Sequence, residues 1–133
     1  MSSYPRCLTQ FAVSWPIQGI ARFRSKESEL VLSDVYWRWI FEALSEKDDG
    51  QRLPFVEAVE DGFRDPSNLV ETIPVTPYFL ELVQQVRPSS APSFERVVPF
   101  EGCTVPSPER ILAEFTKLVG EALLSGTMEM EIE

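Results

Sequence analysis

The sequence predicts an α+β fold, a single compact domain in which a mainly antiparallel sheet is covered on one face by about four helices. Three observations indicate this fold. Polar and apolar residues alternate near both ends of the chain, helical periodicity fills much of the rest, and two helix starts place proline after a Thr or Ser cap. The 133 residues, 44% hydrophobic and 25% charged, are typical of one folded domain, so we expect one α+β domain over residues 1–133.

Strand patterns begin near the N-terminus. Residues 7–15 show a period of two, with four apolar side chains on one parity: Cys7, Phe11, Val13 and Trp15. The segments GIARFR and SELVLS then flank a polar connection from Ser25 to Ser28. This arrangement predicts an antiparallel hairpin with a four-residue connection.

The segment DVYWRWIFEALSEK, residues 34–47, predicts a helix. Ser33 supplies an N-cap oxygen, Asp34 a first-turn acid, and the run Asp48-Asp49-Gly50 a stop. The alternative is a strand with Val35, Trp37, Trp39 and Phe41 on one face. It leaves the helix-forming residues EALSEK unexplained, so we favour the helix.

Two further helices are predicted in the middle of the chain. One begins at Pro54, where a first helical position tolerates proline, and runs to Gly62. The other follows Thr76-Pro77 and contains YFLELVQQV. The connecting segment 64–75 shows no clear period and is expected to be irregular.

The last third of the chain predicts a loop, two strands and a long helix. Residues 87–93 (RPSSAPS) form a surface loop, and residues 94–100 an edge strand because they contain Pro99. The helix begins at Ser107-Pro108, and seven residues fill its apolar face: Ile111, Leu112, Phe115, Leu118, Val119, Ala122 and Leu123. Residues 127–133 (TMEMEIE) alternate throughout and predict a terminal strand.

The residue inventory argues against most catalytic chemistry. The chain has no histidine, which removes Ser-His-Asp and Cys-His mechanisms and His-based zinc sites. Cys7 and Cys103 lie too far apart in sequence for a metal-binding pair, and no glycine-rich phosphate-binding fingerprint occurs. Gly50 and Gly62 each follow acidic residues, but neither fits the register of a calcium-binding loop. We therefore expect a non-enzymatic protein with no cofactor and no metal.

Charge and hydropathy limit the partners. The formal net charge is −9, so direct nucleic-acid binding is not expected. Residues 1–26 carry Arg6, Arg22, Arg24 and Lys26 and no acid, which we interpret as a solvated hairpin face. No apolar run approaches the roughly 20 residues that cross a bilayer, and no secretory signal pattern opens the chain, so we expect a cytoplasmic protein with no membrane partner.

The helix over residues 34–47 has more apolar surface than a surface helix needs. Seven side chains fill an arc of roughly 200°, against somewhat more than ~100° for an ordinary amphipathic helix: Trp39, Ala43, Tyr36, Ile40, Leu44, Trp37 and Phe41. Either its own domain covers the helix on two sides, or one flank is left for a partner. Aromatic and arginine side chains dominate protein interfaces, so the predicted partner-binding residues are Trp37, Arg38, Trp39 and Phe41.

These observations predict a protein–protein interaction domain, a subunit or adaptor of a larger assembly or a small homo-oligomer. Its expected contact surfaces are the aromatic helix and an exposed sheet edge, with residues 94–100 and 127–133 as candidate strands. One alternative is an acidic inhibitor or immunity-type protein that caps a basic site or imitates nucleic-acid charge, since residues 42–71 hold nine acids against three bases. A carboxylate-dependent enzyme with an oxygen-bound metal is a second alternative.

Overall fold

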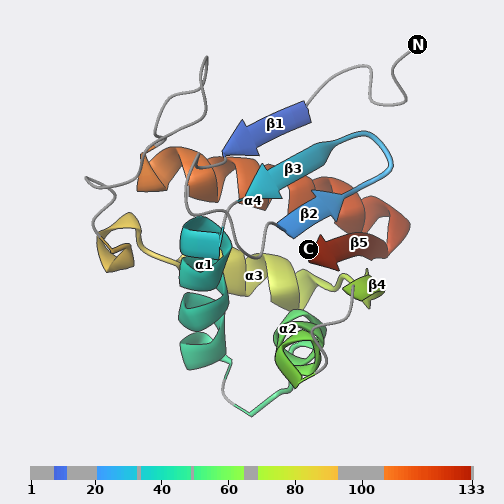
Figure 1. Ribbon diagram of the computed structural model, residues 1–133, viewed down its shortest axis with the longest axis horizontal. Helices are drawn as coiled ribbons and strands as arrows, with labels where there is room; N and C mark the ends of the chain where they lie inside the picture. Colours follow the sequence, from blue (N-terminus) through green and yellow to red (C-terminus); the bar gives the residue numbers. More distant parts are fainter. Residues whose placement is uncertain are drawn as a thin grey trace.

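The computed structural model describes residues 8–11, 21–32, 34–48, 50–64, 69–92 and 107–132. Three strands come first in the described chain, followed by two helices, a strand, two further helices and a last strand, and the expected α+β fold is confirmed (Figure 1). The elements are β1 (Leu8–Phe11), β2 (Ala21–Arg24), β3 (Glu29–Leu32), α1 (Asp34–Lys47), α2 (Pro54–Arg64), β4 (Leu69–Pro74), α3 (Pro77–Gln85), a 3-10 turn η1 (Pro88–Ser90), α4 (Pro108–Ser125) and β5 (Thr127–Ile132).

The strands form one sheet in the order β1-β3-β2-β5-β4. All pairs are antiparallel except β1 with β3, which is parallel. The predicted hairpin is confirmed, because β2 ends at Arg24 and β3 begins at Glu29. The prediction that the last strand offers an exposed edge is wrong: β5 lies between β2 and β4 and pairs with both.

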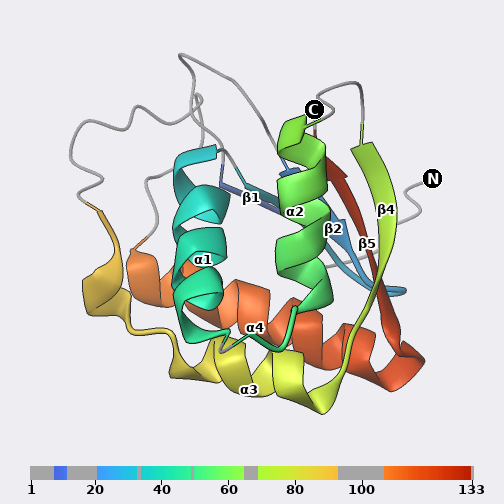
Figure 2. The same cartoon turned by 90° about the horizontal axis from the view of Figure 1, so that it is seen from below.

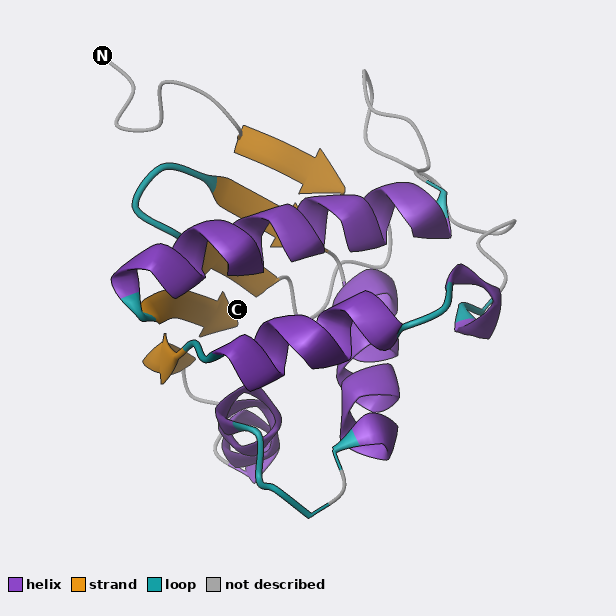
Figure 3. Cartoon of the chain, turned by 180° about the vertical axis from the view of Figure 1, so that it is seen from behind, coloured by secondary structure: helices purple, strands orange, loops and turns teal. Residues whose placement is uncertain are grey.

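The helices pack on one face of the sheet, as predicted. α4 runs across β2, β3 and β5, α2 lies beside β4, and α1 lies next to α2 (Figures 2 and 3). Aromatic rings join the layers: the Phe23 ring of β2 lies 6.1 Å from Phe55 of α2 and 5.4 Å from Phe115 of α4. The sheet contributes seven buried side chains to this core: Ala21, Phe23, Leu30, Leu32, Ile73, Met128 and Met130.

The predicted caps fix the helix starts. The Thr76 hydroxyl accepts a hydrogen bond from the Phe79 backbone N–H at 3.4 Å, and Ser107 accepts one from Arg110 at 3.2 Å. Gly126 ends α4 in the left-handed conformation, with φ at 85°, so the chain can turn directly into β5.

The prediction of an irregular segment over residues 64–75 is wrong for residues 64 and 69–74, and residues 65–68 lie outside the described residues. α2 continues to Arg64, and residues 69–74 form β4, whose Ile73 faces Met128 of β5. Ile73 is 1% exposed, so the strand is held by pairing and burial that local periodicity does not reveal.

Two predictions about loops and edges have mixed outcomes. Within the loop predicted over residues 87–93, Pro88–Ser90 form a short 3-10 turn. Residues 94–100 lie outside the described residues, as does the segment 12–15 of the first predicted strand.

Candidate interaction site

The predicted partner-binding helix, α1, packs against α2, α3 and β3. Trp37 is 1% exposed and Trp39 5%, so both indoles are core residues and offer no surface to a partner, which corrects that part of the prediction. The Arg38 guanidinium is exposed and lies 5.3 Å from the centre of the Trp37 ring. Phe41 is partly buried against the core. The helix is therefore covered on two sides, which explains its wide apolar arc.

Burial of α1 also changes the chemistry of Tyr36. The side chain is 1% exposed, and burial raises the pKa of its phenol above the ordinary value. A phenol kept neutral in this way is a core group rather than a proton-transfer group at neutral pH.

A different surface carries most of the ordered polar contacts of the sheet. The described helices cover one face of the sheet (Figures 1 and 3). Side chains alternate across the strands, so the opposite face carries polar residues of β2, β3 and β5. The strand register sets Arg22 opposite Glu131 and Arg24 opposite Glu129. We call this set the ionic sheet face: Arg22, Arg24, Glu29, Glu129 and Glu131.

Arg24 connects the three carboxylates of the ionic sheet face. Its Nε donates to Glu29 Oε2 at 2.6 Å, and its Nη1 donates to Glu129 Oε1 at 2.8 Å and to Glu131 Oε2 at 3.2 Å. Glu29 also lies 4.0 Å from Arg22 Nη1. A carboxylate as buried as Glu29 is costly unless paired, so these guanidinium groups are needed to keep it in place.

Exposure increases across the ionic sheet face. The side chain of Glu29 is 6% exposed, that of Arg24 22%, and that of Glu129 48%. The β2 and β5 side of the face is therefore its more accessible part, and Arg24 holds Glu129 there.

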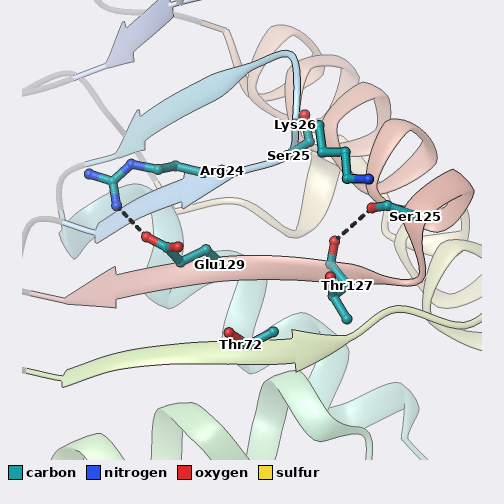
Figure 4. A pocket seen from close by; sticks show the side chains of 7 residues that line it. All are labelled: Arg24, Ser25, Lys26, Thr72, Ser125, Thr127 and Glu129. Atoms are coloured by element: carbon teal, nitrogen blue, oxygen red, sulfur yellow. Dashed lines mark hydrogen bonds and ion pairs between the residues drawn. The ribbon is translucent and has the colours of Figure 1, made fainter. Parts of the chain in front are cut away.

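A pocket of about 350 Å³ continues this surface at the β2–β3 turn (Figure 4). Its walls come from three separate stretches of the chain, residues 24–26, Thr72 and residues 125–129: Arg24, Ser25, Lys26, Thr72, Ser125, Thr127 and Glu129. The Lys26 side chain extends toward Ser125, whose hydroxyl donates to the Thr127 carbonyl at 3.3 Å. Hydroxyls, one ammonium and one carboxylate of this lining can hydrogen-bond polar groups.

The other side of the same turn is tied to α4. The Ser28 hydroxyl donates to Glu121 Oε1 at 2.6 Å, which fixes the hairpin turn against the helix. Leu124, also on α4, is a large hydrophobic residue with 92% exposure. It lines a shallow pocket with Lys26 and Glu121.

The acid-rich part of the sequence forms a second surface. α1 and α2 stand side by side (Figure 2), and four exposed carboxylates belong to them: Glu42, Glu46, Glu57 and Glu60. We call these four the acidic helical surface. Asp48 at the α1–α2 junction accepts hydrogen bonds from the Tyr78 hydroxyl at 2.9 Å and the Leu53 N–H at 2.7 Å, so it supports the turn.

The described residues meet the requirements of neither a metal site nor a membrane-spanning helix. Among the described residues, no group of three or more Cys, Asp or Glu side chains is arranged to hold a metal ion. In the same ranges, no helix combines the length and apolar character that crossing a bilayer requires.

Comparison of the chain with protein-family models, curated proteins and solved structures finds no match. What defines the protein is therefore its own geometry: an α+β domain whose sheet carries an ordered arginine–glutamate network.

Reasoning from the sequence did not identify this network. One signal was present, because ARFR and TMEMEIE both alternate charged with apolar residues, in opposite signs. Recognising the network required knowing that β2 and β5 are neighbours, although Arg24 and Glu129 lie 105 positions apart.

Proposed function

We propose that this chain is a non-enzymatic protein–protein interaction domain, a subunit or adaptor of a larger assembly, and that it contacts its partner through the ionic sheet face. The observation that carries the proposal is the Arg24 network, in which one guanidinium orients three carboxylates on the sheet face away from the described helices. Charges held in fixed positions provide specificity and speed association more than they add raw affinity.

The arrangement favours binding over catalysis. Arg24 forms ion pairs with Glu29, Glu129 and Glu131, so these side chains are preorganised. Preorganised side chains lose little conformational entropy when a partner binds. The proposal includes a cytoplasmic location. It also includes no direct contact with nucleic acid, which the net charge of −9 supports.

Affinity capture with matched variants tests the proposal. The wild-type chain, Glu129→Lys and Glu81→Lys are immobilised and exposed to lysate of the source cell. Both substitutions make the same charge change at exposed positions, but Glu81 lies on α3, away from the sheet face. We expect a specific protein set to be retained by wild type and Glu81→Lys and lost by Glu129→Lys. Identical retention by all three chains would overturn the use of this face.

The acidic helical surface supports a second candidate, an inhibitor that caps a basic site. Its four exposed carboxylates come from two helices packed together, and exposed Arg38 lies one turn before Glu42 on α1. Association would be fast and salt-sensitive. We expect Glu57→Lys with Glu60→Lys to abolish binding of a basic partner that Glu129→Lys leaves bound. Binding that is equally strong at low and high salt would rule out this candidate.

A further inference from the structure

We infer that the ionic sheet face binds the same face of a second copy of this chain. The two-fold axis runs parallel to the strands and lies midway between the two facing sheets, above the line that separates β2 from β5. This inference rests on the proposed function and names the partner.

The charge pattern indicates the partner. The less buried part of the face has a basic row on β2, Arg22 and Arg24, beside an acidic row on β5, Glu129 and Glu131. A uniformly acidic or uniformly basic surface would be repelled by one of the two rows. The complementary surface has an acidic row opposite β2 and a basic row opposite β5. A second copy placed face to face with the first by this rotation sets its acidic β5 row opposite β2 and its basic β2 row opposite β5.

The strand register makes the match specific. Arg22 and Glu131 are Cα partners, as are Arg24 and Glu129, so each arginine stands level with a glutamate. Rotation about an axis between the two strands therefore sets Arg24 of one copy over Glu129 of the other, and Arg22 over Glu131. Symmetry doubles these two contacts to four. A two-fold axis across the strands would set arginine over arginine, which electrostatic repulsion opposes.

The distances suit this arrangement. Sheets that pack face to face lie about 10 Å apart, a gap that an arginine and a glutamate reaching toward each other can bridge. Glu129 is the most exposed carboxylate of the network at 48%, and Arg24 already directs one of its oxygens. The arginine–glutamate pairs between the two copies therefore use side chains that are already held in position within each copy.

The size of the face sets the strength of the dimer. Its strands have four to six residues, well short of the area of a standard stable interface. We expect a reversible dimer with a dissociation constant on the order of 10–100 μM, weakened by salt because its contacts are charged.

Sedimentation equilibrium of the full chain tests the inference. From about 1 μM to about 1 mM, the weight-average mass is expected to rise from the chain mass of 15.1 kDa toward twice that value. Glu129→Lys is expected to weaken the dimer about ten-fold or more, and Glu81→Lys to leave it unchanged. A wild-type chain that stays monomeric over this range overturns the inference.

A charge-swap mixture makes the test specific to the proposed axis. Glu131→Arg alone opposes two guanidinium groups across the interface, and Arg22→Glu alone opposes two carboxylates, so each variant is expected to be monomeric. In a 1:1 mixture both cross-pairs are again arginine with glutamate, and the dimer is expected to return. Circular dichroism checks that each variant is folded. If either is unfolded, the salt dependence of the wild-type dimer and the effect of Glu129→Lys on dimer formation decide the test. A dimer unaffected by any of these changes uses another face and refutes the inference.

The two proposals fail separately. A monomeric chain whose captured proteins are lost with Glu129→Lys refutes the dimer and keeps the proposed function. If neither capture nor self-association responds to Glu129→Lys, both proposals fall.

Discussion

The indole N–H of Trp39 donates a 3.0 Å hydrogen bond to the hydroxyl of Ser90, which ties α1 to the 3-10 turn after α3. Ser90 in turn donates to the Arg87 carbonyl at 2.7 Å, so the turn is closed on itself and attached to the helix. The bond explains how a tryptophan can be 5% exposed near the rim of the core: its ring is packed and its one polar atom is satisfied.

Removal of the Trp39 side chain tests its place in the core. We expect Trp39→Ala to lower the free energy of unfolding by about 3–5 kcal/mol, the cost of a large cavity. Trp39→Phe should cost less, since it keeps a packed ring and loses one hydrogen bond worth about 1 kcal/mol. Denaturant melts measure both, with Leu124→Ala at a 92% exposed position as the control. A Trp39→Ala melt equal to wild type would show that the indole is not a core group.

Loss of the Arg24 guanidinium should destabilise the sheet through Glu29. We expect Arg24→Met to cost about 3–5 kcal/mol, because it leaves a carboxylate of 6% exposure without its 2.6 Å partner. Adding Glu29→Gln to this variant should recover part of the loss, since a neutral amide is cheaper to bury. Thermal or denaturant melts of the single and double variants decide. Additive effects of the two substitutions would mean that the residues are not coupled.

Pro74 should protect the β4 edge. The Val75 N–H donates to the Gly126 carbonyl at 2.8 Å, so the backbone nitrogen of Val75 points toward β5. Backbone nitrogens alternate in direction along a strand, so that of Pro74, one residue earlier, points outward from the sheet edge. Proline there removes an outward donor from the edge strand. We expect Pro74→Thr to keep the fold but increase aggregation during mild heating, followed by light scattering. Pro92→Thr, exposed and outside the strands, is the control. Equal scattering from both variants would contradict this role.

The buried Tyr36 should make the fold sensitive to alkali. Burial raises the pKa of its phenol, so the folded state holds the proton more tightly than the unfolded chain does. Its contribution to stability is therefore complete below the unfolded pKa of about 10 and is lost as the pH rises above that value. We expect Tyr36→Phe to show a flatter fall in stability above about pH 10, measured by denaturant melts at several pH values. Parallel pH curves for the two chains would refute this account.

The sequence by itself determined the elements that depend on neighbouring residues. The helix over Asp34–Lys47, the caps at Thr76 and Ser107, and the hairpin with its connection from Ser25 to Ser28 are all present as predicted. Periodicity, proline position and capping act within a few residues, so they can be recognised without knowledge of the fold.

Only the tertiary structure decided which surfaces meet. β4 exists because its Ile73 pairs with Met128 and is buried, and Trp37 is a core residue because helices and sheet cover α1 on both sides. The candidate site has the same origin, since Arg24 reaches Glu129 only after β2 and β5 have become neighbours. Each of these contacts joins residues far apart in the chain, and burial and pairing partner depend on the whole packed domain rather than on local sequence.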